Sequence, residues 1–179
     1  MTMGKSDSLL GTAAPGFDEP LDMLRACHGR IDAQCRTLEK LLGHLAQFGG
    51  DEQARQAAAA VLRYFDTAGR HHHADEEENL FPMLLQTAPA DTQALVSGLL
   101  AEHDAMERLW EQLRVSLSEI AQGKSAGLSE VDVSDFVARY TKHIDTENTQ
   151  LLPLAERVLS LEQRERLGRA MAERRGARR

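Results

Sequence analysis

Imidazole and carboxylate side chains recur in the same pattern in two distant stretches of the chain. The first stretch reads HHHADEEENLFP from position 71, and within it His72 precedes Glu76 by four residues. Residues four apart lie on one face of an α-helix, so these two side chains can converge on one point. The second stretch, 71 positions later, pairs His143 with Glu147. Both stretches fit H-x3-E-x3-L-[FL]-P, and so long a shared pattern indicates two halves of one site rather than a solvated helix face.

Two further histidines interrupt apolar seams elsewhere in the chain. His28 and His103 each stand in a series of apolar residues spaced three and four apart, as expected for the buried face of a helix. A lone histidine in such a seam is usually a hydrogen-bonded core residue, but here four predicted helices carry one each. Buried carboxylates need a compensating charge, and the seams offer no Lys or Arg at matching positions. We therefore predict a metal site with the ligands His28, His72, Glu76, His103, His143 and Glu147.

Apolar periodicity predicts the four helices that would hold these ligands. The expected ranges are Asp18 (as the cap) to Gly49, Asp51 to Pro89, Asp91 to Gly123, and Ser129 to about residue 160. Abundant Ala, Leu, Glu, Gln and Arg, with only 4% aromatic residues, favour helices over strands. We predict an all-α protein: an antiparallel up-down-up-down four-helix bundle over 18–160, after a mobile N-terminal arm (1–17) and before a basic C-terminal helix and tail (161–179).

The prolines that follow the paired sites help to choose between adjacent histidines. His72 lies ten residues before Pro82, just as His143 lies ten residues before Pro153, whereas His73 breaks this match. We therefore expect His72 to be the ligand and His73 to point toward a neighbouring helix or water. Both prolines should bend their helices, because proline lacks the backbone N–H and crowds the preceding turn.

Antiparallel helices must place their ligands at one depth in the bundle, and the first two hairpins satisfy this condition. The third hairpin fits less well, with 19 residues from His103 to Gln122 but 13 from Glu130 to His143. At 1.5 Å per residue the difference is about 9 Å. Either the third helix overhangs, or the loop after it must climb back along the bundle.

Composition narrows the class of protein. The formal net charge of −7 argues against a general nucleic-acid binder. There is no apolar run long enough to span a membrane and no secretory signal, so we expect a soluble cytoplasmic protein without a membrane partner. Cys27 and Cys35 are about 12 Å apart along one predicted helix, too far for a disulfide, and we expect reduced structural thiols.

The C-terminal segment carries an excess of arginine. After Ser160 there are seven arginines and three acidic residues, a net charge of +4 (seven minus three). One interpretation is a short solvated helix with a frayed tail. The other is a contact surface for an acidic partner or nucleic acid.

The ligand set and its spacing resemble the hemerythrin-like (HHE cation-binding) domain family over roughly residues 20–160. The resemblance rests on His28, the pair His72 and Glu76, His103, and the pair His143 and Glu147, with L-F-P and L-L-P after the pairs. It implies a non-haem di-iron centre in which the two glutamates bridge two iron ions, which an oxo or hydroxo group can also bridge. Imidazole and carboxylate are suitable iron ligands on chemical grounds as well.

The chain departs from the oxygen-carrying members of that family at one position. Those members have a second histidine four residues after the third-helix ligand, where this chain has Glu107. Either Glu107 supplies an additional carboxylate ligand, or one iron keeps an open site. In neither case do we expect simple reversible oxygen carriage. Glu77 and Tyr140 are expected to lie around the ligands rather than to bind iron.

The leading functional hypothesis is di-iron binding coupled to oxygen, nitric oxide or redox state, in a sensing, protective or iron-handling role. One alternative is a ferritin-like di-iron oxidase or oxygenase, but those bundles use Glu-x-x-His pairs, which are absent from this sequence. The other is a zinc-binding structural or interaction module, although zinc usually takes a single four-ligand site. No enzymatic turnover is predicted from the sequence.

Overall fold

A computed structural model describes residues 15–87, 89 and 91–177, and every regular element in these ranges is a helix. The prediction of an all-α protein is confirmed. Residues 1–14 of the predicted arm, and 178–179 of the tail, lie outside the described residues. None of the helices in the described ranges is long and apolar enough to cross a membrane.

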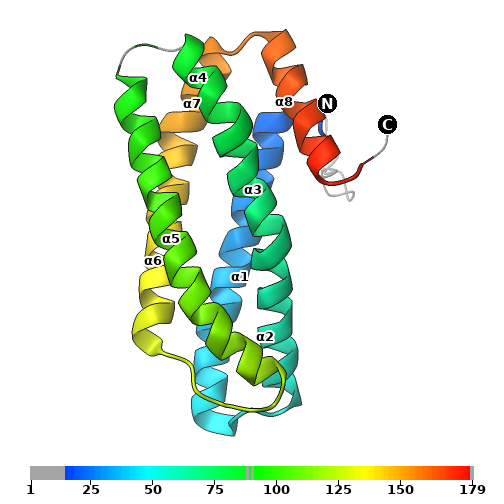
Figure 1. Ribbon diagram of the computed structural model, residues 1–179, viewed down its shortest axis with the longest axis vertical. Helices are drawn as coiled ribbons and strands as arrows, with labels where there is room; N and C mark the ends of the chain where they lie inside the picture. Colours follow the sequence, from blue (N-terminus) through cyan, green and yellow to red (C-terminus); the bar gives the residue numbers. More distant parts are fainter. Residues whose placement is uncertain (1–14, 88, 90, 178–179) are drawn as a thin grey trace, which may run out of the picture.

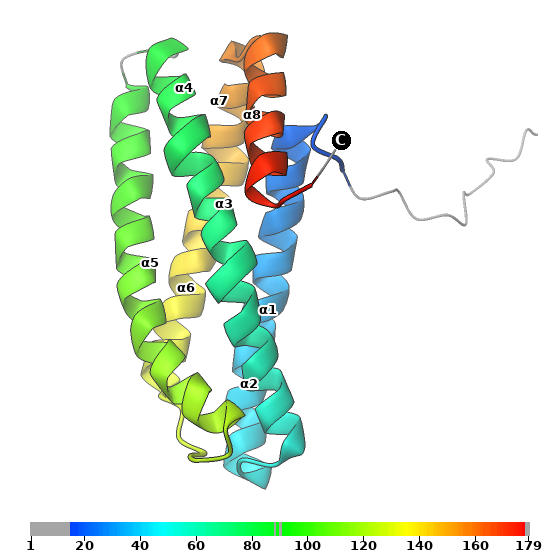
Figure 2. The same ribbon diagram turned by 45° about the vertical axis from the view of Figure 1, so that its right-hand side comes forward.

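Four helical rods run side by side along the long axis of the molecule (Figures 1 and 2). The first is α1 (Pro20–Phe48) and the third is α5 (Thr92–Ala121). The second consists of α2 (Glu52–Tyr64), η1 (Phe65–Gly69), α3 (Arg70–Asp75), η2 (Glu76–Leu80) and α4 (Phe81–Thr87). The fourth consists of α6 (Glu130–Thr146), η3 (Glu147–Leu151) and α7 (Leu152–Val158), and α8 (Leu161–Arg174) follows it. Here η denotes a π-helical turn.

The helix starts follow local capping chemistry. Asp51 accepts a hydrogen bond from the Ala54 N–H (2.9 Å), and Ser129 accepts one from the Asp132 N–H (3.2 Å), which satisfies orphan donors at the start of α2 and α6. The expectation that Asp18 caps the first helix is wrong. Glu19 holds the cap position and makes no side-chain cap hydrogen bond, and Pro20 follows it in the first turn, where its missing N–H leaves no donor unpaired.

The two prolines change the winding of their helices. Instead of a break, a π-helical turn precedes each of them: η2 ends two residues before Pro82, and η3 ends two residues before Pro153. A widened turn relieves the clash between the proline ring and the preceding carbonyl groups. These turns begin at Glu76 and Glu147, so each widened turn starts at one of the two predicted carboxylate ligands.

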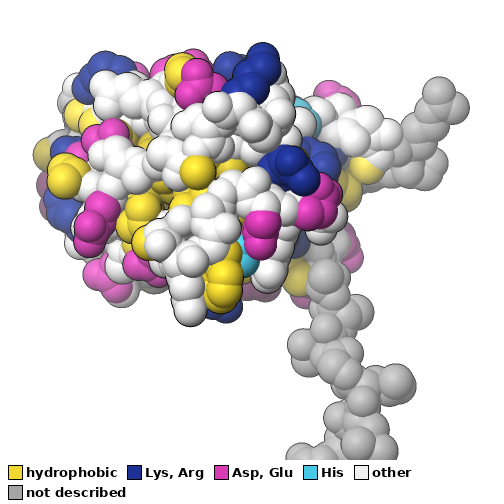
Figure 3. All heavy atoms as spheres, turned by 90° about the horizontal axis from the view of Figure 1, so that it is seen from below, with side chains coloured by type: hydrophobic (Ala, Val, Ile, Leu, Met, Phe, Trp, Pro, Cys, Tyr) yellow, Lys and Arg dark blue, Asp and Glu magenta, His cyan; other side chains and the backbone are white. Residues whose placement is uncertain are grey.

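In the third hairpin, the different distances from His103 and His143 to the loop are accommodated in both of the ways predicted from the sequence. α6 begins higher along the bundle than α5 ends, and the loop between them climbs back toward it (Figure 1). Gly123, with a φ of 70°, turns the chain out of α5 in the left-handed region that favours glycine. Seen from this end of the bundle, acidic, basic and apolar side chains are interspersed (Figure 3).

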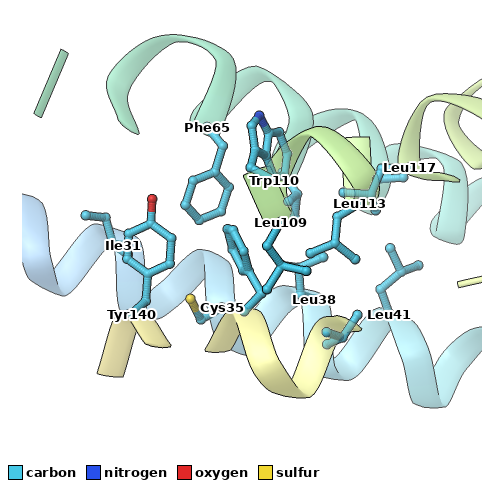
Figure 4. Close-up of a cluster of buried hydrophobic side chains, with 14 of the residues drawn as sticks. Ile31, Cys35, Leu38, Leu41, Phe65, Leu109, Trp110, Leu113, Leu117 and Tyr140 are labelled. Carbon is cyan, nitrogen blue, oxygen red and sulfur yellow. The ribbon is translucent and has the colours of Figure 1, made fainter. Parts of the chain in front are cut away.

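The buried apolar side chains form two separate cores. The lower core contains residues from Ile31 onward in α1, Phe65, Met106 onward in α5, and α6 up to Ile144. Figure 4 shows part of it, where the rings of Phe65, Trp110 and Tyr140 lie together, with Phe65 5.0 Å from Trp110 and 5.5 Å from Tyr140. The free cysteine Cys35 belongs to this core, and Cys27 is also buried and free.

The upper core lies beyond the predicted ligands on every rod. It contains Leu24 of α1, Leu80 of η2, Leu99 of α5 and Leu151 of η3, among others. On the first three rods the predicted ligands fall in the gap between the two apolar cores. On the fourth rod Glu147 falls in this gap, and His143 lies one residue before Ile144, the end of the lower core there.

Helix α8 folds back onto the bundle and completes the upper core. Leu167 and Met171 are fully buried in it. Gly168 allows a close approach, because a Cβ at this position would overlap the carbonyl oxygen of Phe17. A capping box between Ser160 and Gln163 starts the helix. The basic segment is thus a packed helix with an apolar face, and not only a solvated one.

Candidate metal centre

Six buried side chains from the four rods meet between the two cores. Each is at most 2% exposed: His28, His72, Glu76, His103, His143 and Glu147. They form two groups of four, and in each group one ligand atom per residue lies within 4.8 Å of the others. The first group contains His28 and His72, and the second contains His103 and His143. Both groups contain Glu76 and Glu147.

Each shared glutamate presents its two oxygen atoms to different groups. Glu147 Oε2 lies 3.0 Å from His28 Nε2, while its Oε1 lies 3.2 Å from His143 Nε2. Glu76 Oε1 lies 3.6 Å from His72 Nε2, while its Oε2 lies 3.5 Å from His103 Nε2. Two carboxylates arranged in this way can bridge two cations, each of which would also face two imidazoles.

Three of the four imidazoles are oriented by an oxygen acceptor on Nδ1. The pairs are His28 with Asn148 Oδ1 (2.8 Å), His103 with Glu77 Oε1 (2.7 Å), and His143 with Glu102 Oε2 (2.9 Å). Carboxylate and amide oxygens only accept hydrogen bonds, so Nδ1 carries a proton in each pair, and in the neutral imidazole Nε2 keeps a lone pair. Those lone pairs point into the centre, as metal-binding histidines require.

The centre contains many buried polar atoms without a hydrogen-bond partner. They include Nε2 of His28, both ring nitrogens of His72, and all four carboxylate oxygens of Glu76 and Glu147. In addition, His103 Nε2 and His143 Nε2 face each other at 2.9 Å although the Nδ1 of each is the protonated nitrogen. Two ligands at a right angle on one metal, with bonds of about 2.1 Å, are about 3 Å apart. The residues therefore fit bound cations, which would satisfy atoms that are otherwise costly to bury.

The pKa values of the two glutamates are shifted in opposite directions. Burial, and then the charge of Glu147, raise the pKa of Glu76 well above its usual range. Burial also opposes ionisation of Glu147, but the imidazoles of His143 and His28 outweigh it and hold the pKa of Glu147 well below its usual range. Without a cation, Glu76 is therefore the more readily protonated of the two carboxylates. A cation that displaces a proton from Glu76 would leave both carboxylates ionised and able to hold it.

The pKa values of His72 and His143 are shifted by burial and by neighbouring side chains. Burial, followed by the nearby His28, lowers the pKa of His72 well below its usual value, so this imidazole is neutral and available as a ligand. Burial also disfavours the charged form of His143, but contacts with Glu147 and Glu102 overcome this and raise its pKa. In the absence of a cation, a second proton on His143 lies on Nε2, from which a bound cation would displace it.

The residues expected around the ligands occupy different positions. Glu77 contacts His103, as described, but Tyr140 contacts His73 (Oη to Nε2, 3.3 Å) rather than a predicted ligand. Glu107 is exposed and belongs to none of the metal-compatible groups among the described residues. Asn148 and Glu102 were missed by the sequence reasoning, which offered no signal for them because their partners lie on other helices.

A buried aspartate beside the centre also escaped prediction. Asp75, between His72 and Glu76, is fully buried and contacts Arg174 Nη1 and Arg175 Nη2, the second at 2.5 Å. Arg174 also reaches Glu78 (2.6 Å). Two arginines of the basic C-terminal segment thus bind acidic side chains of this chain itself, on the helix that carries two predicted ligands.

A pocket of about 210 Å³ opens next to the second group. Its lining includes Phe65, Trp110 and Tyr140 from the lower core, together with His73, Glu77 and Glu107. The His73 ring stacks on that of His103, with centroids 4.0 Å apart and 12° between the planes. His73 therefore does not point into water, but lies between the pocket and a predicted ligand.

Comparison with known proteins agrees with this arrangement. Residues 19–155 match the sequence model of the hemerythrin HHE cation binding domain, a range that contains all six central residues. The chain belongs to the hemerythrin HHE cation-binding family. It is also 30% identical over 159 residues to an uncharacterised protein of Haemophilus influenzae, covering 89% of this chain and 91% of the relative. Membership of the HHE family and the buried His and Glu groups together indicate metal binding.

Proposed function

We propose that this protein binds two iron ions in a non-haem centre that reacts with oxygen, nitric oxide or redox state. His28 and His72 would hold one ion, His103 and His143 the other, and Glu76 and Glu147 both. The observation that carries this proposal is that each of the two glutamates directs its two oxygens to histidines of different groups. When bound, the ions supply redox chemistry, and the surrounding chain orients the imidazoles and keeps both glutamates away from bulk water.

The presence of only two imidazoles in each group supports reactivity rather than protected carriage. Glu107 stands where oxygen-carrying members have a histidine, and it is not among the residues grouped around the centre. This supports an ion in the second group that would keep one position for a small diatomic ligand. A sensing, protective or iron-handling role agrees with this, and we assign no turnover.

Metal content and absorption spectra test the proposal. Protein reconstituted with iron under anaerobic conditions should contain about two irons per chain, and after reduction it should oxidise on exposure to air. One metal per chain, or retention of zinc in preference to iron, would favour the zinc-module alternative. A stable oxygen-dependent absorption band that disappears under vacuum would instead indicate reversible carriage.

The ferritin-like oxidase remains the enzymatic alternative. Its signature is a carboxylate-rich site, whereas four of the six central residues here are imidazoles. Sustained turnover of ferrous ion with oxygen, far beyond two ions per chain, would favour that alternative.

A further inference from the structure

The stretch that begins at His72 contains two His-x3-Glu pairs in adjacent registers. His72 and Glu76 form the pair that faces the centre, while His73 and Glu77 form a second pair turned by about 100°. Ligand atoms of His73, Glu77 and His103 lie within 4.8 Å of one another, so these side chains form a third close cluster of potential ligands. Exposure decreases along this group, because Glu77 is exposed, His73 is half-buried and His103 is buried.

His73 is close to the centre but is not placed as a resident ligand of it. An imidazole nitrogen directs its lone pair in the plane of the ring. Since the rings of His73 and His103 are stacked nearly parallel, 4.0 Å apart, they share no point in both planes where one ion could sit. Tyr140 holds His73 in this orientation through its hydroxyl group. His73 therefore faces the pocket side of His103.

The pocket has the size and charge to admit a hydrated cation. Its volume of about 210 Å³ compares with about 30 Å³ for one water molecule in the liquid. Glu77 and Glu107 line it together with one cationic side chain, Arg70. Arg70 is itself paired with Glu111 at 3.1 Å, so the carboxylates dominate the local charge. Such a lining attracts cations and repels anions.

We infer that this pocket is the route by which a divalent metal ion reaches the centre. Glu107 attracts the ion at the surface, and His73 and Glu77 bind it transiently beside His103 before it passes to the second group. The inference rests on the proposed metal centre and assigns Glu107 and His73 a role in uptake rather than in the loaded site. It is a ligand-exchange path and requires no oxidant or reductant.

Uptake kinetics test this route. Metal-free protein would be mixed with cobalt(II) in a stopped-flow instrument under anaerobic conditions, and ion binding would be followed by visible absorption. His73→Ala and Glu107→Gln should each fill about tenfold more slowly than the wild type, and both should still end with two ions per chain by elemental analysis. Added salt should slow cobalt(II) uptake more in the wild type than in Glu107→Gln. The reason is that the wild type has one more carboxylate whose attraction for the ion is screened by salt.

Two matched variants control for general effects. His71→Ala removes a neighbouring imidazole that belongs to neither the pocket nor the metal-compatible groups. Asp104→Asn removes the same charge as Glu107→Gln from an exposed position on α5 outside the pocket. Both control variants should bind cobalt(II) at the wild-type rate. Glu77 is not used as a test position, because it also orients His103.

The possible results separate this inference from the proposed function. If the wild type binds two ions but His73→Ala and Glu107→Gln fill as fast as it does, the route is wrong and the centre stands. If His73→Ala ends with one ion per chain, His73 is a resident ligand and the transit role is wrong. If the wild type itself binds no ion, the proposed function fails and the route fails with it.

Discussion

At the scale of single residues, the choice between His72 and His73 depends on one step of helical register. The structure brings His72 together with His28, Glu76 and Glu147 and places His73 beside the pocket. Neither ring nitrogen of His72 has a hydrogen-bond partner, so a bound cation is the contact that would satisfy this side chain.

Alanine substitution at the two positions should therefore have different effects. His72→Ala should lose at least one iron, because it leaves His28 as the remaining imidazole of the first group. His73→Ala should keep both irons at equilibrium. Iron per chain after anaerobic reconstitution measures this, with unfolding curves to verify that both variants fold. The reverse outcome would mean that the register of this helix is misassigned by one residue.

At the scale of secondary-structure elements, the contact between α8 and α3 couples the C-terminal helix to the helix that carries His72. Asp75 is fully buried, and the side chains of Arg174 and Arg175 that bind it are only 16% and 21% exposed. Removing the partners of a buried charge is strongly destabilising, whereas replacing the whole pair by neutral groups costs much less.

Replacing both arginines should therefore destabilise the protein. Arg174→Ala with Arg175→Ala leaves Asp75 buried without its partners, and the free energy of unfolding of the metal-free protein should fall by about 3–5 kcal/mol. Adding Asp75→Asn should recover part of this loss. Arg169→Ala, on the same helix and in an exposed pair with Glu165, should change the free energy of unfolding by less than about 1 kcal/mol. Denaturant unfolding measures all three, and equal losses in the double variant and the Arg169 control would contradict the role of this contact.

At the scale of the whole molecule, the polar layer between two apolar cores makes stability depend on bound metal. Binding to the folded state alone stabilises it by about 4 kcal/mol at a thousandfold excess over the dissociation constant. Metal-free protein should therefore melt at a lower temperature than the iron form. Equal melting temperatures would mean that the buried histidines are satisfied without metal.

The difference between the two melting temperatures should grow with pH. The pKa of Glu76 is raised well above 4.5 in the fold, so the stabilising effect of its protonation is present below about 4.5 and is lost as pH rises through the raised pKa. As the pH rises, the metal-free protein loses this contribution. A cation that binds ionised Glu76 offsets the loss, and it competes less with protons at higher pH. Melting curves at a series of pH values from about 5 to 8 measure the difference, and a constant gap would contradict this origin.

Much of the centre was predictable because helical periodicity is local. The four-residue spacing from His72 to Glu76 and from His143 to Glu147 places each pair on one face in any α-helix. The seams containing His28 and His103 likewise identify buried faces before the partner helices are known. All-α structure, four rods and the six central residues follow from these short-range patterns.

Only the tertiary structure decided the contacts that join different rods. Asn148 and Glu102 reach His28 and His143 because packing sets the rotation of each helix about its axis, and sequence spacing contains no such information. The same rotation leaves Glu107 at the pocket instead of in the centre. The pairing of Asp75 with arginines about 100 residues away depends on the path of α8 across the bundle, which no local pattern specifies. Helix geometry fixes which residues share a face, whereas packing fixes what that face meets.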